Sequence, residues 1–181
     1  YSTPRSVTLT GLGAVDGFNG LEAALAGAFY DVDSIIGTSS NADTFTGWNG
    51  GATFDLNGSV LYQSGTHDVL LNGYENLNGG SGADTFVVHG NETFNLNGGA
   101  GNDTFRFLDF ATLKGTIDGA DGTNTLDYSS YTSSRDIYLQ GYGSLTGYSG
   151  SEFDTIGSFT NINNIIGGSE NDALSGTNDA G

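Results

Sequence analysis

The chain has 181 residues with 31 Gly, one Pro and neither Cys nor Met, which excludes collagen and disulfide scaffolds. Its 21 Asp and Glu against 4 Lys and Arg give a formal net charge of −17, so neither nucleic acid nor an anionic membrane is an expected partner. The 11 Phe and 9 Tyr distinguish it from disordered acidic tails and predict a buried core. No apolar stretch approaches the roughly 20 residues that a membrane helix needs, so membrane insertion is not expected.

The first predicted feature in chain order is a Gly-rich excursion over Gly11–Ala28. Within it, Gly20–Ala26 could form one helical turn. A later segment of matching pattern, Gly150–Ile156, carries β-branched and polar residues at the same places, which disfavours a helix. The stretch Gly11–Ala28 and its counterpart Gly141–Ser158 are therefore expected to be excursions or wider coils of a β-structure.

Short strands are predicted next, because polar and apolar residues alternate over 53–56, 93–96 and 104–107. Clusters of Asn and Gly punctuate them, and these residues tolerate the positive φ of tight corners. The strand-to-glycine boundaries recur every 19 to 21 residues, at Gly37, Gly58, Gly79, Gly98 and Asp118. This period predicts an all-β fold, a parallel β-solenoid with coils of about 20 residues.

A second pattern coincides with these boundaries. Segments 79–87 and 98–106 both read G-G-x-G-x-D-x-U-x, in which U is a large apolar residue. Three degenerate copies accompany them: 119–126 has Asn for Asp, 167–174 has Glu for Gly, and 37–45 carries one extra residue.

These strings resemble the calcium-binding nonapeptide of the repeats-in-toxin (RTX) family. A hard Ca²⁺ takes six to eight oxygens, and a Gly-rich corner can point carbonyls inward while the Asp supplies charge. Stacked coils about 4.8 Å apart would bring Asp84 beside Asp103, so that one ion is shared. The predicted cofactor is Ca²⁺, and the predicted metal-site residues are Gly80, Gly82, Asp84, Gly99, Gly101, Asp103, Asn124, Asp172 and Asp43.

The chain departs from the RTX pattern, because each coil holds at most one good nonapeptide. We therefore expect one broken column of sites, with the Asp84/Asp103 pair best and the Asp103/Asn124 pair next. Asp172 would continue the column, and Asp43 would have no immediate partner. The alternative is that these corners are plain turns, in which each Asp caps backbone N–H groups and no metal binds.

The longest pattern is a repeat at an offset of 130, at which 13 of the first 37 positions recur identically, among them Arg5 as Arg135 and Glu22 as Glu152. Residues 1–130 are thus predicted to form one complete unit, and 131–181 the first part of the next unit in the same solenoid. Such a tandem array resembles the modules of very large bacterial surface proteins, adhesin-like and secreted. The resemblance implies a right-handed solenoid, secretion through a calcium-poor cytoplasm and folding outside the cell.

The expected function is structural: a calcium-stabilised extracellular rod whose units stack head to tail. One alternative is the calcium-binding accessory segment of a secreted enzyme. Another is a glycan-binding adhesin module, for which the candidate aromatic residues are Trp48, Tyr62, Tyr138, Tyr142 and Tyr148. No enzymatic activity is expected of the chain itself, because the pairs of His67 with Asp68 and His89 with Glu92 are interpreted as surface residues.

Overall fold

The computed structural model describes residues 2–24 and 27–176, and all regular secondary structure in that part of the chain is β-strand. The predicted all-β class is confirmed. Gly20–Glu22, where one helical turn was weighed, lies in a strand, and residues 25–26 lie outside the described residues. The described part of the chain contains no helix long and apolar enough to span a membrane.

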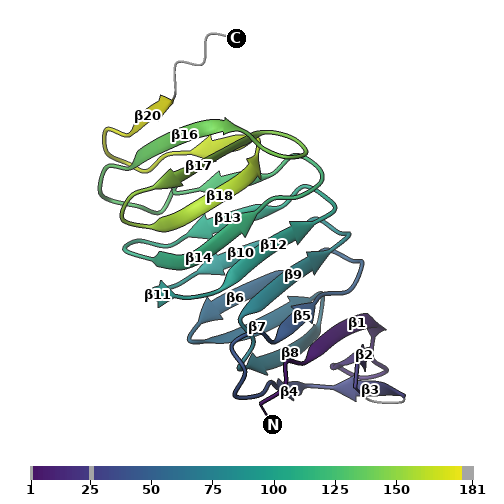
Figure 1. The fold of residues 1–181 in the computed structure, drawn as a ribbon. Coiled ribbons are helices and arrows are strands. Elements are labelled where there is room, and N and C mark those ends of the chain that lie inside the picture. Colours follow the sequence, from purple (N-terminus) through teal and green to yellow (C-terminus); the bar gives the residue numbers. More distant parts are fainter. Residues whose placement is uncertain (1, 25–26, 177–181) are drawn as a thin grey trace.

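The strands of the described residues form two sheets (Figure 1). The 12-stranded sheet, called sheet A, consists of β1 (Ser6–Leu12), β2 (Phe18–Glu22), β3 (Ala28–Val32), β5 (Thr44–Thr46), β9 (Asn76–Gly80), β11 (Asn91–Glu92), β12 (Asn95–Gly99), β14 (Thr112–Asp118), β16 (Asp136–Tyr142), β17 (Tyr148–Glu152), β18 (Ile156–Ile162) and β20 (Ala173–Gly176). The 8-stranded sheet, called sheet B, consists of β4 (Ser34–Ile36), β6 (Thr53–Asn57), β7 (Ser59–Ser64), β8 (His67–Asn72), β10 (Thr85–Val88), β13 (Thr104–Phe107), β15 (Thr125–Asp127) and β19 (Asn164–Ile166).

Through its middle, the chain alternates between the sheets and advances along the stack. Strands β9, β12 and β14 pair in parallel in sheet A, while β10, β13 and β15 pair in parallel in sheet B. The register matches Thr85 with Thr104 and Thr104 with Thr125, which are steps of 19 and 21 residues. The predicted spacing of about 20 residues therefore describes this middle region, where Figure 1 shows the strands rising in order along the long axis.

The sheets are nevertheless mixed, because three antiparallel hairpin arrangements interrupt the parallel pairing: β1–β2–β3, β6–β7–β8 and β16–β17–β18. Gly58 and Gly65, with φ of 72° and 62°, reverse the chain at the two ends of β7. The expectation that Gly58 marks a coil boundary was wrong, since a tight turn there folds β7 back on β6. The Gly-rich excursion likewise contains a strand, β2, paired with β1.

The core lies between the sheets, because alternate residues of each strand point inward. In sheet B, the register stacks Phe54, Phe86 and Phe105, all fully buried, with ring centroids 4.4 Å and 5.1 Å apart. The inward residues of sheet A, such as Leu77 and Leu96, are matched in the same way. The buried residues form one continuous hydrophobic cluster between the two sheets.

The two segments related by the 130-residue offset adopt the same arrangement. Val7 pairs with Glu22 and Ile137 with Glu152, and the register shifts just after Leu9 in one hairpin and just after Leu139 in the other. The second segment joins the stack through parallel pairs of β18 with β14 and of β19 with β15. The start of the second segment thus continues both sheets.

Candidate functional site

The two complete nonapeptides lie at the corner where the chain passes from sheet A to sheet B. Asp84 directly precedes β10, Asp103 precedes β13 and Asn124 precedes β15. Because these strands are in register, the three side chains occupy one column, one coil apart. All three are buried, with at most 1% of each residue exposed.

Asp43 and Asp172 do not belong to this column. They precede β5 and β20, which are strands of sheet A, so they lie at the opposite corner, where the chain returns from sheet B. The predicted site residues therefore lie in two columns, one at each corner, and not in the single column that the sequence predicted. The prediction of one column was wrong because the nonapeptide pattern predicts a corner but carries no information on which sheet the next strand joins.

A hydrogen-bond ladder connects the column that contains Asp84. The backbone N–H of Ala52 donates to Asp84 Oδ1 at 2.8 Å, and that of Asp84 donates to Asp103 Oδ1 at 2.9 Å. The N–H of Asp103 donates to Asn124 Oδ1 at 3.0 Å, and that of Asn124 to Asn163 Oδ1 at 2.8 Å. Each side chain therefore caps a backbone N–H group of a neighbouring coil, whereas the plain-turn interpretation expected caps within the same turn.

The second carboxylate oxygen has no such partner. Asp84 Oδ2 and Asp103 Oδ2 are buried and accept no hydrogen bond. A methyl group added to Gly79 would meet both Asp84 Oδ2 and the carbonyl oxygen of Gly98, so these two acceptors lie on the same side of the glycine. A methyl group added to Gly98 would likewise meet Asp103 Oδ2 and the carbonyl oxygen of Gly119 in the next coil. A buried carboxylate oxygen that accepts no hydrogen bond is stabilised by a proton or by a cation.

The third corner shows what a donor changes. At Asn124 the side-chain Nδ2 lies where the aspartates have Oδ2, and it donates to the carbonyl oxygen of Asn161 at 3.2 Å. The amide therefore satisfies both groups without any ion. Of the three corners in this column, the two with Asp contain a carboxylate oxygen without a hydrogen-bond donor, and the one with Asn has an N–H donor at the same position.

The electrostatics follow from this geometry. Burial raises the pKa of Asp84 to about 7, helped by the negative charge of Asp103, although the hydrogen bond from Ala52 opposes the shift. Burial also raises the pKa of Asp103 to about 6. Both carboxyls consequently hold a proton far more readily than an exposed aspartate does.

Asp43 contrasts with both. Its two oxygens accept hydrogen bonds from the backbone N–H groups of Arg5 and Thr38 and from the Thr38 hydroxyl. Burial alone would raise the pKa of Asp43, but these hydrogen bonds outweigh it and the net shift is downward. Asp172 is more exposed and caps the N–H of Arg135 at 2.8 Å. These two aspartates therefore cap the backbone N–H groups of Arg5 and Arg135, which directly precede β1 and β16.

The glycines of the nonapeptides allow the coils to approach each other. Gly80, Gly99 and Gly101 have φ of 126°, 90° and 124°, which L side chains rarely adopt. A side chain on Gly82 would collide with the backbone of Gly50 in the preceding coil. The glycine pattern is thus explained by stacking, whatever occupies the corner.

The composition of the corners limits what they can bind. The described residues contain no group of three or more His, Cys, Asp or Glu side chains that could hold a metal ion. An ion at Asp84 and Asp103 would draw its remaining ligands from backbone carbonyls. Unpaired buried carboxylate oxygens beside carbonyl oxygens are hard donors of the kind that Ca²⁺ prefers, although each corner offers only one such carboxylate oxygen.

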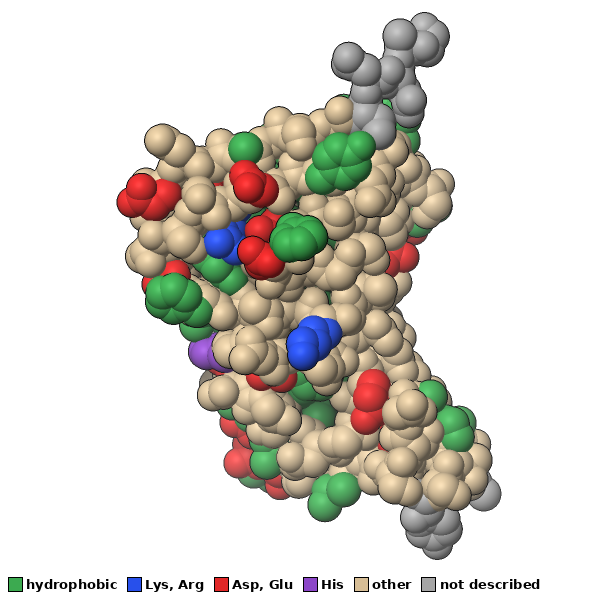
Figure 2. Space-filling view, turned by 60° about the vertical axis from the view of Figure 1, so that its left-hand side comes forward, with side chains coloured by type: hydrophobic (Ala, Val, Ile, Leu, Met, Phe, Trp, Pro, Cys, Tyr) green, Lys and Arg blue, Asp and Glu red, His purple; other side chains and the backbone are tan. Residues whose placement is uncertain are grey.

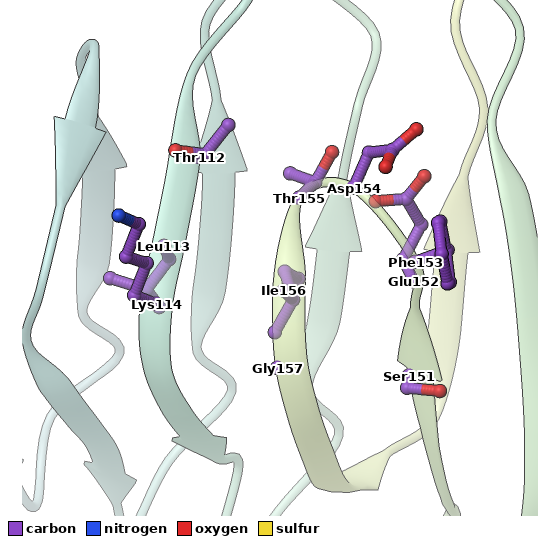
Figure 3. A pocket seen from close by; sticks show the side chains of 10 residues that line it. All are labelled: Thr112, Leu113, Lys114, Ser151, Glu152, Phe153, Asp154, Thr155, Ile156 and Gly157. Carbon is purple, nitrogen blue, oxygen red and sulfur yellow. The ribbon is translucent and has the colours of Figure 1, made fainter.

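Two surface hollows lie away from the column. One, of about 480 Å³, lies between β14 and the turn that joins β17 to β18. Figure 3 shows Glu152 and Asp154 near the tip of this turn and Lys114 on β14, on the other side of the hollow. The other hollow, of about 490 Å³, opens beside β3 and β4 and is lined mainly by apolar side chains. The surface in Figure 2 carries dispersed acidic side chains with isolated Lys and Arg between them.

The aromatic and imidazole candidates divide between core and surface. Tyr62 is fully buried, and the indole N–H of Trp48 donates to Ser64 at 3.1 Å. Tyr142 and Tyr148 are 84% and 43% exposed and stack on each other with centroids 5.5 Å apart, and Tyr138 is 43% exposed.

The two histidines have different neighbours. His67 Nε2 lies 3.3 Å from the carbonyl oxygen of Gly13. His89 Nε2 lies 3.2 Å from Asp55 Oδ1 rather than beside Glu92, which instead accepts a hydrogen bond from Gly58.

Sequence reasoning missed the paired charges that fix the hairpins to the stack. Arg5 contacts Glu22 at 3.3 Å, and Arg135 contacts Glu152 at 3.4 Å, with the Arg135 guanidinium 4.3 Å from the ring centre of Tyr131. The signal was present, because both members of the pair recur at the offset of 130 in a chain with only 4 Lys and Arg.

Comparison of the chain with protein-family models, with curated proteins and with solved structures gave no match.

Proposed function

We propose that this chain is a segment of an extracellular structural rod: a β-solenoid, interrupted by antiparallel hairpins, that grows by tandem repetition of a unit spanning residues 1–130 and is stabilised by calcium. One observation carries the proposal. Strands β18 and β19, which belong to the second unit, pair in parallel with β14 and β15 of the first. A new unit therefore begins by adding strands to both existing sheets, as a rod requires.

The side-chain contacts at this junction support a continuous rod. Ile117 is matched with Phe159 and Leu126 with Ile165, so the apolar interior passes from one unit to the next. Asn161 Nδ2 donates to Asp118 Oδ1 at 2.7 Å, and this bond from a buried side chain joins the two units. Long-range stiffness follows when every coil is packed on both sides.

The role of calcium rests on the corners at Asp84 and Asp103. When bound there, Ca²⁺ would supply the positive charge that the two unpartnered Oδ2 atoms lack. Above pH 7 both carboxyls lose their protons, because their raised pKa values are about 7 and 6, and a cation is then needed in place of the proton. Millimolar calcium outside a cell would then stabilise the stack, while a calcium-poor cytoplasm would leave it weaker.

The other candidate functions gain less from the structure. Tyr148 corresponds to the buried Phe18 of the first unit, so its exposure is explained by its place near the end of the stack. Glycan binding then rests on Tyr142 and Tyr138, which are 84% and 43% exposed. No observation on the described residues favours the accessory segment of an enzyme over a rod.

The decisive experiment compares Asp84→Asn with wild type by chemical denaturation at pH 8, in chelator and in 5 mM calcium. Asparagine at this position can donate to the carbonyl of Gly98, as Asn124 donates to Asn161. We expect the variant to be about 1 kcal/mol more stable than wild type in chelator. We also expect it to lose most of the stabilisation that calcium gives to wild type.

Asp68→Asn is the matched control, since it removes an exposed carboxylate on β8 and should leave the calcium response unchanged. A calcium titration of wild type by calorimetry supplies the second readout. If calcium neither binds nor stabilises wild type, and Asp84→Asn gains nothing in chelator, the calcium part of the proposal is wrong.

A further inference from the structure

The end of the stack formed by β3 and β4 is incomplete in a specific way. These strands are the outermost members of sheets A and B, so each has one edge without a partner strand (Figure 1). Beside them lies the hollow of about 490 Å³, whose apolar lining includes Phe29, Val32, Ile35 and Ile36. We call this surface, β3 and β4 with the hollow, the open end.

The same strands occur a second time with their partners in place. Strand β18 is the counterpart of β3, and β19 is the counterpart of β4, at the offset of 130. Both are covered by β14 and β15. Phe159 is 2% exposed and Ile162 1% exposed, whereas Phe29 and Val32, at the equivalent positions, are half-buried. Ile36 is 76% exposed, against 47% for Ile166.

We propose that the open end is a docking face for the β14–β15 end of another copy of the same 130-residue unit. The inference rests on the proposed function, in which units repeat, and it names the partner of this surface. The occupant follows from continuity with the junction already present in the chain, where this pairing occurs between β14–β15 and β18–β19.

The backbone of the open end offers the groups that the junction uses. At the junction, the N–H groups of Asn163 and Asn164 donate to the carbonyl of Asn124, at 2.9 Å and 3.0 Å. Their counterparts are Asp33 and Ser34, both exposed. The N–H of Gly119 donates to the carbonyl of Thr160. The equivalent carbonyl at the open end belongs to Tyr30, which is 73% exposed. The apolar side chains agree as well, since Ile117 would cover Phe29 and Leu126 would cover Ile35.

One position departs from this complementarity. Asn161 Nδ2 donates to Asp118 Oδ1 at the junction, but its counterpart is Asp31. The backbone conformation is the same, with φ of 56° at both residues, and Oδ1 of each accepts a hydrogen bond from the turn, from Val15 and Leu145 respectively. Docking would therefore place the second oxygen of Asp31 against the carboxylate of Asp118. Docking at the open end should be weaker than the junction, and Asp31→Asn should strengthen it.

The test supplies the partner covalently, by adding a second copy of residues 52–130 in front of residue 1 of the full chain. Residues 28–36 still occur once, so their backbone hydrogen exchange can be followed by mass spectrometry without ambiguity. We expect their exchange to slow at least tenfold relative to the original chain and to approach that of residues 158–166. The N–H groups of Asp33 and Ser34 should be among those protected.

Asp31→Asn provides the specific control. It should slow exchange of residues 28–36 further in the extended chain but leave it unchanged in the original chain, where no Asp118 faces it. Ile117→Asp in the added copy alone should restore fast exchange of these residues.

The exchange of the β12 and β13 peptides reports whether the added copy is folded. A single slowly exchanging population there, with residues 28–36 still as fast as in the original chain, would overturn the proposal. The readout does not depend on calcium, so a failure of the calcium proposal leaves this test intact.

Discussion

Residues 28–36 and 158–166 have nearly the same apolar pattern but different surroundings. Phe159 is buried against the preceding coil, while Phe29 lies at an end of the stack and is only half-buried. The reverse holds for Phe18 and Tyr148. Phe18 is fully buried beneath Tyr62 at 5.2 Å, and Tyr148 is 43% exposed. The comparison teaches that in this stack a residue's burial depends on the neighbouring coil as much as on its own segment.

The largest expected difference between the two regions comes from removing the same ring at both places. Phe159→Ala should lower the free energy of unfolding by about 4 kcal/mol, because it leaves a cavity at the junction of the two units. Phe29→Ala should cost about 1–2 kcal/mol, since this ring is only partly buried. Urea denaturation of both variants measures the difference, and equal losses would show that the coil over Phe159 adds nothing.

The paired charges give the second comparison. Arg135→Ala should cost about 3 kcal/mol, because it leaves the carboxylate of Glu152, 3% exposed, without its cation. Arg5→Ala should cost less, about 1 kcal/mol, since Glu22 is more exposed and more easily hydrated. Adding Glu152→Gln to Arg135→Ala should recover part of the loss, as measured by thermal unfolding. A double variant no more stable than Arg135→Ala would argue that packing on Tyr131 is the larger effect.

The third prediction contrasts the two corners of the coil by pH. Asp84 and Asp103 have raised folded-state pKa values of about 7 and 6, so the folded protein binds more protons than the unfolded chain between about pH 4 and pH 7. In chelator, their contribution to stability should therefore fall as pH rises through this window, on the order of 3–4 kcal/mol for each carboxyl. Asp43 has a lowered pKa, so its contribution should be lost only as pH falls below about 4.

Thermal unfolding from pH 3 to pH 8, with and without calcium, measures these opposite slopes. The double variant Asp84→Asn, Asp103→Asn should flatten the upper slope and leave the acid limb. A stability profile in chelator that rises between pH 4 and pH 7 would contradict the assignment of the two unpaired oxygens.

Much of the local structure could be predicted from residue patterns. Alternation over 53–56 and 104–107 predicted strands that form, and the nonapeptides predicted corners that place Asp84 one coil from Asp103. Gly58 misled because a glycine of positive φ serves a hairpin turn as well as a coil corner. Asp43 was assigned to the same column as Asp84 because nothing within nine residues says which sheet follows a corner.

The sequence by itself determined the β class, the spacing of the middle coils and the equivalence of residues 130 apart, because alternation and repetition are properties of the chain alone. Tertiary structure decided the rest. It placed the carboxylates at two different corners, gave Asp43 its donors and left Asp84 Oδ2 without one. It also paired β18 with β14, while β3 remained the outermost strand of sheet A. These outcomes depend on which strands become neighbours, and hydrogen bonding and burial act between coils that the sequence separates by 20 to 40 residues.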